Sequence, residues 1–142
     1  KKMNMLSAAS NINWWAVLVA ALTSSVLGGL WFAALFAKPY AVALGRQDQP
    51  KEKPAPIFFV GPFVCGLIVV IASALLIETL DIRTISTAIE FGLVIGVGYL
   101  AATTMNTAIN PNFPRPLYYG AISSGYFVLT SIAVSVILVA MR

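Results

Sequence analysis

The sequence of 142 residues contains no histidine and a single cysteine. Histidine is the usual axial ligand of haem, the commonest metal ligand and the usual general base near neutral pH, so its absence argues against all three kinds of site. One cysteine excludes an intrachain disulfide and a thiolate cluster. Cys65 lies in an apolar run, where we expect a small buried side chain.

Catalytic motifs are also absent. The sequence has no G-x-S-x-G, no P-loop and no H-E-x-x-H, which are the patterns that place a nucleophile, a phosphate cradle or a zinc ion. An enzyme would have to work with hydroxyls and carboxylates alone. We therefore predict no catalytic residue, no metal, no cofactor and a protein that is not an enzyme.

Charge is scarce. Only 10% of the residues are charged and 59% are hydrophobic, and the mean hydropathy of +0.87 is too high for a soluble domain with a wetted surface. The net charge is +4, but the nine basic residues are spread over the termini and loops. Because they form no basic stripe, we expect no binding of nucleic acid, and we expect a lipid bilayer around the chain.

Four long apolar stretches fill most of the chain, at about residues 14–36, 57–77, 85–108 and 117–141. At about 1.5 Å rise per residue, each is long enough to cross a hydrocarbon core of about 30 Å. The first exceeds the usual core of a signal peptide, so we expect it to be a permanent span. Residues 1–142 are predicted to form a single transmembrane domain, an all-α integral membrane four-helix bundle with short loops.

The ends of the first span carry local signals. Ser10, Asn11 or Asn13 is expected to cap its start. After it, residues 39–44 are predicted to form a short interfacial helix that begins at a proline and stops at Gly45. The rest of this connection, to Pro56, is rich in proline and charge, which predicts a linker at the membrane surface, with a docking loop for a partner as the alternative.

Small residues recur along one face of the first, third and fourth spans, where they allow helices to approach closely. Gly92 and Gly96 form a G-x-x-x-G step, and a period of 3.6 residues places Thr103 and Thr107 in the same sector of the third span. The third and fourth spans are expected to be antiparallel partners across a short turn. The predicted helix-packing residues are Ala16, Ala20, Ser24, Gly28, Gly92, Gly96, Gly120, Ser124, Ser131 and Ser135.

Polar side chains crowd the third span. Glu90, Thr103, Asn106 and Thr107 are candidates for a polar path for a solute, whereas hydroxyls in lipid usually bond to neighbouring backbone or helices. Glu78, Asp81 and Glu90 are acids near the membrane surface. Pairing with Arg83 is the simpler interpretation of these acids, and binding of a cation or relay of protons is the alternative.

The distribution of basic residues bears on orientation. The loops after the first and third spans hold Lys38, Arg46, Lys51, Lys53 and Arg115, and the opposite side holds Lys1, Lys2, Arg83 and Arg142. If the two N-terminal lysines are not native, the balance becomes five to two. The rule that basic loops stay in the cytoplasm then predicts a multi-pass protein of the bacterial inner membrane with both termini outside.

Glycine and aromatic residues form a recognisable pattern at the start of the chain. The first span contains N-W-W-A-V-L-V-A-A-L and then G-G-L-W-F, and the segment F-A-K-P-Y-A-V-A-L-G follows. The pattern resembles the opening of a family of small bacterial membrane proteins catalogued as domain of unknown function 1761, and F-P-R-P-L-Y-Y from Phe113 is similar in kind. The resemblance implies the four-span fold and no activity, so no functional residue is carried over.

Two positions depart from that family pattern. Ala33 and Ala34 stand where members often have Ser-Pro, and Tyr40 stands where tryptophan is common. The resemblance therefore does not predict a break at the end of the first span.

Two hypotheses of function follow. In the first, a non-catalytic bundle uses its small-residue faces to form a homo-oligomer or to dock as an accessory subunit on other membrane protein subunits. In the second, an oligomer forms a small transporter or channel lined by the polar residues of the third span.

Overall fold

The computed structural model describes residues 4–142, which form helices and no strand. η1 is a 3-10 helix, and η2 and η3 are π-helical segments that continue α1 and α4. The elements are η1 (Ser7–Asn11), α1 (Trp14–Leu30), η2 (Trp31–Leu35), α2 (Ala37–Ala43), α3 (Ile57–Thr79), α4 (Ile85–Ile95), η3 (Gly96–Ala101), α5 (Ala102–Ala108) and α6 (Pro116–Ala140).

Four of the helical stretches are long and apolar enough to cross a membrane. They run over Trp14–Leu35, Ile57–Thr79, Ile85–Ala108 and Pro116–Ala140, within two residues of the predicted spans. The predicted all-α class with four spans is confirmed. Such an arrangement is expected of a multi-pass membrane protein.

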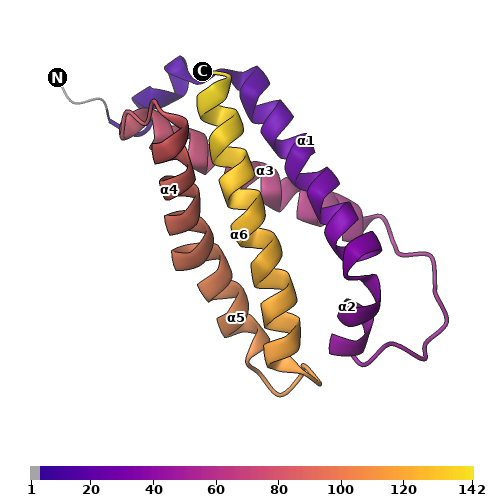
Figure 1. Ribbon diagram of the computed structural model, residues 1–142. Helices are drawn as coiled ribbons and strands as arrows, with labels where there is room; N and C mark the ends of the chain where they lie inside the picture. The colour runs from indigo at the N-terminus through magenta and orange to yellow at the C-terminus, as the bar shows by residue number, and fades with distance from the viewer. Residues whose placement is uncertain (1–3) are drawn as a thin grey trace.

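α6 lies at the centre of the molecule. It packs against α4, η3 and α5 on one side and against α1 on the other, and α3 passes behind it at a steep angle (Figure 1). Since α4 and α6 follow each other across the turn of residues 109–115, they run antiparallel, as predicted. The apolar core lies between α1, α3, α4 and α6 and includes Ala20, Ile77, Phe91 and Leu138.

Only the second half of α3 belongs to this core. Its buried residues all lie from Val70 onward, whereas its first four residues, 57–60, are all exposed. The expectation that Cys65 is buried is wrong, because its side chain lies on the outward face of α3 and is exposed. In a bilayer this outward face lies against lipid, where a thiol is in an apolar environment, as it would be in a buried core.

Two local motifs delimit the first span. The side chain of Asn13 caps α1 by accepting hydrogen bonds from the backbone N–H groups of Trp15 at 3.0 Å and Ala16 at 3.4 Å. The Asn13 amide also donates to the carbonyl of Met141 at 2.6 Å, which ties the start of α1 to the end of α6. Asn13 is thus the capping residue among the three candidates.

The short helix after the first span is present as α2, which begins at Ala37 rather than at Pro39. It ends in a left-handed turn at Gly45, whose φ is +66°. There the N–H of Arg46 donates to the carbonyl of Ala41 at 2.8 Å and that of Gly45 to Val42 at 3.1 Å. These are the two bonds of a Schellman motif, which favours glycine because a left-handed residue with a Cβ is strained.

Candidate functional site

α4 and α6 approach each other closely. A Cβ on Gly92 would lie 2.7 Å from the Cα of Ile132, and one on Gly96 would lie 3.0 Å from the Cα of Val128. Both neighbours are backbone atoms that cannot rotate away. The G-x-x-x-G step therefore packs inside one copy of the chain and is unavailable to a second copy.

The same contact continues toward the turn at residues 109–115. A Cβ on Gly120 would lie 2.5 Å from the sulfur of Met105, and the Ser124 hydroxyl donates to the carbonyl of Ala101 at 3.2 Å. At the other end, Ser131 and Ser135 are buried, and the Ser135 hydroxyl donates to the Ser131 carbonyl at 2.7 Å. Serine here acts as a small residue whose hydroxyl bonds to a backbone carbonyl, across to η3 for Ser124 and within α6 for Ser135.

η3 rotates the second half of the third span. A π-helical segment holds one residue more than α-helix would, so the residues after it turn by about 100° relative to a regular helix. Ala108 is therefore buried against α6, whereas Thr103 and Thr107 are exposed. The prediction that these two threonines share the face of Gly92 and Gly96 is wrong for this reason.

The small residues of α1 face α3 and α6. Ala16 and Ala20 are buried, and a Cβ on Gly66 of α3 would lie 3.5 Å from the hydroxyl oxygen of buried Ser24. A Cβ on Gly28 would lie 3.1 Å from the hydroxyl oxygen of Tyr126, and that hydroxyl donates to the carbonyl of Ser24 at 2.8 Å. A tyrosine from α6 thus fills the space left by a glycine of α1.

Aromatic rings link η2, α2 and α6 at the end of the molecule opposite the termini. The ring centroids of Phe32 lie 4.9 Å from Tyr40 and 5.2 Å from Tyr126, and Tyr119 lies 5.7 Å from Tyr40 and 4.4 Å from Phe113. The segments that resemble the family pattern, far apart in the sequence, therefore meet in space.

η2 contributes Trp31 and Phe32 to this end of the molecule. Its i to i+5 bond joins the N–H of Phe36 to the carbonyl of Trp31 at 2.8 Å, and the Trp31 indole donates to the carbonyl of Ile122 at 3.0 Å. A break thus occurs at the end of the first span even though Ala33 and Ala34 replace the usual Ser-Pro. The break follows the π segment, at Phe36, and no proline is present there.

Tyr40 has a perturbed pKa. Burial, and to a smaller extent the neighbouring Tyr119, together raise the pKa of its phenol from 10.0 to about 12, against an opposing effect of Arg46. The hydroxyl is therefore neutral throughout the physiological range, which suits a packing role and gives no acid or base catalyst near neutral pH.

The outer face of the third span carries an exposed row of residues with a polar side chain at each end, here called the polar stripe. Glu90, Val94, Gly98, Ala102 and Asn106 follow one another at intervals of four residues, and all five are exposed. A Cβ on Gly98 would meet no atom within 4 Å. The four residues predicted as a polar path, Glu90, Thr103, Asn106 and Thr107, all lie on this outward side and enclose no space within one copy.

Hydrogen bonding differs among these residues. The Thr107 hydroxyl donates to the carbonyl of Thr103 at 3.0 Å, which satisfies it within its own helix. In the described chain the side-chain amide of Asn106 has no hydrogen-bond partner. It is thus available to a molecule outside this copy.

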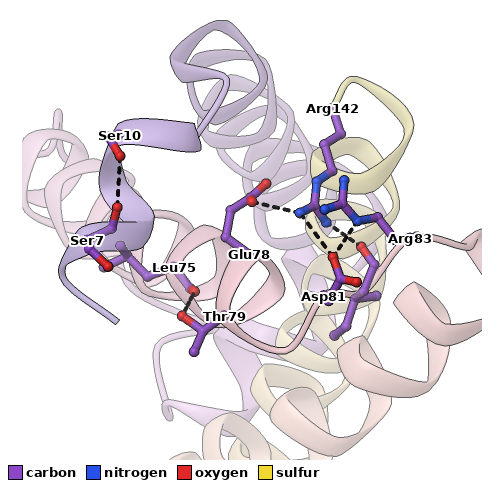
Figure 2. Close-up of polar contacts among 9 residues, drawn as sticks. Ser7, Ser10, Leu75, Glu78, Thr79, Asp81, Arg83 and Arg142 are labelled. Carbon is purple, nitrogen blue, oxygen red and sulfur yellow. Dashed lines mark hydrogen bonds and ion pairs between the residues drawn. The ribbon is translucent and has the colours of Figure 1, made fainter. Parts of the chain in front are cut away.

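A charged cluster ties the opposite end of the molecule together (Figure 2). The Arg142 guanidinium donates to the carboxylate of Glu78 at 2.6 Å and to the carbonyl of Ile82 at 2.7 Å. Its nitrogen also lies 3.7 Å from the carboxylate of Asp81, which pairs with Arg83 at 2.5 Å. The expected pairing with Arg83 thus holds for Asp81, whereas Glu78 pairs with Arg142 from the end of α6.

The two ion pairs differ in burial. The Glu78 and Arg142 side chains are 8% and 15% exposed, whereas Asp81 and Arg83 are 69% and 61% exposed. Arg142 places a positive charge against the carbonyl end of α3, where an unpaired Glu78 would be unfavourable. Since both partners are satisfied, the cluster is a structural clamp, and the described residues hold no group of three potential metal ligands.

Comparison with known families identifies the chain. Residues 15–139 match a family described as "Protein of unknown function (DUF1761)", which covers nearly the whole chain. The chain belongs to this family. The match agrees with the resemblance seen in the sequence, and the family description assigns no activity. Comparison with curated proteins and with solved structures gives no match.

In this family member, the sequence did not predict the ion pair of Glu78 with Arg142 or the position of the polar stripe on the outer face of the third span. The i+4 spacing from Glu90 to Asn106 was visible, but regular helical periodicity across η3 assigned Thr103 and Thr107 to the buried face. Nothing in the sequence pairs Glu78 with a residue 64 positions away.

Proposed function

We propose that this protein is a non-catalytic membrane module that self-associates through the outer face of α4, η3 and α5. The observation that carries this proposal is the exposed stripe from Glu90 to Asn106, which has polar side chains near both ends of a span and Val94, Gly98 and Ala102 between them. The small residues predicted to mediate helix packing contact other helices of the same copy, whereas this stripe is exposed and joins polar ends to a glycine and an alanine.

The chemistry of the stripe favours a second copy as its occupant. An amide carries both donors and an acceptor, so Asn106 complements itself across a two-fold axis, as an isologous interface requires. Gly98 and Ala102 leave room for the backbone of a facing helix. Glu90 lies five residues inside the start of α4, close enough to the interface for its carboxylate to reach water.

The non-catalytic part of the proposal rests on how three of the buried hydroxyls are used. Ser24, Ser73 and Ser135 each donate to a backbone carbonyl of their own helix. Such hydroxyls stabilise packing and are not poised as nucleophiles, because no base lies against them.

Disulfide cross-linking in native membranes tests the proposal. In a Cys65→Ser background, Ala102→Cys is expected to give a covalent dimer on mild oxidation, since a disulfide requires Cα atoms about 4.4–6.8 Å apart. Val26→Cys, on the exposed face of α1, is the matched control and is expected to stay monomeric. Gly98→Ile and Asn106→Leu should each reduce the Ala102→Cys dimer.

The other outcomes are informative. Equal cross-linking at residues 26 and 102, or none at either, would refute the proposed face. Cross-linking of Ala102→Cys to a different protein would replace self-association by an accessory role in a larger membrane assembly.

A pore between copies is the second candidate, because the polar residues face outward rather than into the core. In that case Asn106 and Thr103 would line a path at the subunit contact. Flux of ions or small solutes into liposomes that falls with Asn106→Leu and is unchanged with Val26→Leu would favour it. Absence of flux for dimer-containing liposomes would remove it.

We also propose an orientation in the bacterial inner membrane with both termini outside. The connectivity brings Lys38, Arg46 and Arg115 to one end of the molecule and Arg83 and Arg142 to the other, and Lys1 and Lys2 lie outside the described residues. Basic loops favour the cytoplasm. A membrane-impermeant amine label should reach residues 47–53 only in inverted vesicles, and labelling of intact cells there would reverse the orientation.

A further inference from the structure

The connection between α2 and α3 borders an open cavity whose lining residues are all exposed. This loop swings out beside the lower end of the molecule in Figure 1, and the cavity of about 780 Å³ lies between it and the start of α3. Its lining residues are Arg46, Gln49, Pro50, Lys51, Glu52, Lys53, Pro54, Ala55 and Phe58.

The lining is basic. Arg46, Lys51 and Lys53 contribute three cationic groups against the single carboxylate of Glu52, so the cavity carries a net charge of +2. The ion pairs of the described chain are formed by other residues. Three cationic groups of a loop are therefore available to an anion.

The start of α3 adds to this field. α3 begins at Ile57 without a side-chain cap and without an acidic residue in its first turn, so the partial positive charge of its N-terminus is not neutralised. Pro54, Ala55 and Phe58 from this region line the same cavity. The N-terminus of α3 adds a smaller positive potential to that of the three cationic side chains.

An apolar surface leads directly away from the cavity. Phe58 lines the cavity and is 68% exposed, and Ile57, Phe59 and Val60 beside it are 64%, 66% and 56% exposed. Further along the same half of α3, which leans away from the other helices, Val64 and Ile68 are also exposed. A basic cavity continued by an apolar strip matches a molecule with an anionic head and hydrocarbon chains.

We infer that the loop of residues 46–56 and the first half of α3 form a binding site for an anionic phospholipid, with the headgroup phosphate held by Arg46, Lys51 and Lys53. The acyl chains lie against the exposed apolar surface of this half of α3, with Val64 and Ile68 on one side of the helix and Phe58 on an adjacent side. Free phosphate shares the headgroup chemistry but gains nothing from the apolar strip, so the lipid is the occupant that the structure favours. The site is independent of the proposed contact at Gly98 and Asn106.

Native mass spectrometry of the protein with added lipid tests the site. Wild-type protein in mild detergent is expected to retain phosphatidylglycerol at least about tenfold better than phosphatidylcholine with the same chains, since each basic residue near an anionic surface contributes about fivefold. Arg46→Gln combined with Lys51→Gln and Lys53→Gln should abolish this preference. Lys38→Gln with Arg115→Gln, which neutralises basic residues of the same end outside the cavity, is the control and should keep it.

Two further arms distinguish the sources of the phosphate and test the apolar strip. Millimolar inorganic phosphate should fail to displace the lipid; displacement would mean a site for a free anion and would overturn the assignment. Phe58→Ser with Ile68→Ser should weaken retention of both lipids alike. Equal retention of the two lipids by the wild type, or an unchanged preference in the triple variant, would refute the proposal.

Discussion

Replacing Gly92 by alanine is expected to separate α4 from α6. The added Cβ would lie 2.7 Å from the Cα of Ile132, 3.0 Å from its nitrogen and 3.0 Å from the carbonyl oxygen of Ser131. Carbon atoms in contact prefer about 3.5–4.0 Å, so the two helices must part locally by about 1 Å. All three obstructing atoms are backbone, which leaves no rotamer change as a remedy.

The magnitude follows from two opposing terms. Overpacking of this kind costs about 1–3 kcal/mol, and alanine regains up to about 1 kcal/mol of helix propensity relative to glycine. Gly29→Ala is the matched control, because the same substitution at Gly29 meets no atom within 4 Å. The gain in helix propensity is common to both variants, and only Gly92→Ala carries the cost of overpacking. The free energy of unfolding of Gly92→Ala should therefore be about 1–3 kcal/mol lower than that of Gly29→Ala.

Unfolding in mixed micelles, followed by the helical circular dichroism signal as sodium dodecyl sulfate is added, measures this difference. Gly92→Ala should unfold at a lower detergent fraction than the wild type, and Gly29→Ala at the same or a higher fraction. If the two variants unfold together, the close contact of α4 with α6 at Gly92 is wrong.

Two other predictions concern single side chains. Arg142→Ala leaves the Glu78 carboxylate buried without its partner and is expected to destabilise the fold by about 3 kcal/mol. Arg83→Ala removes a partner from an exposed ion pair and should change the unfolding midpoint little. Equal effects of the two variants would contradict a structural role for the Glu78–Arg142 pair. The pKa of Tyr40, raised from 10.0 to about 12, means that its contribution to stability is complete below pH 10 and is lost as the pH rises toward 12. Absorbance at 295 nm should show a late-titrating phenol that Tyr40→Phe removes, and an unchanged profile in that variant would refute the assignment.

The π segments show why the sequence predicts where the spans lie more accurately than which residues of a span face the other helices. Length and hydropathy alone predict the four spans, because each must cover the hydrocarbon core with nearly uncharged residues. The inward residues Gly92 and Gly96 also follow from regular spacing. Beyond η3, regular spacing points to Thr103 and Thr107, which the extra residue of the π segment turns outward.

α3 illustrates a second limit. Its whole length is apolar, so nothing in its sequence separates the half that packs against α1 from the half that faces lipid. Lipid and protein interior are both apolar, and hydrophobicity therefore does not distinguish them. The exposure of Cys65 follows from the steep crossing of α3 behind α6 (Figure 1) and was inaccessible to sequence reasoning.

The sequence by itself determined the apolar surroundings of this protein, the number of its spans and the stop at Gly45, and it limited the cap of the first span to three residues, because these features depend on composition and on local backbone chemistry. The tertiary structure alone decided which polar groups meet. The buried pair of Glu78 with Arg142, the aromatic contact of Phe32 with Tyr126 and the outward turn of Asn106 all join or orient residues through the packing of separate helices. Such contacts depend on helix crossing angles and on the rotation that η3 introduces, and neither is encoded in any short stretch of the chain.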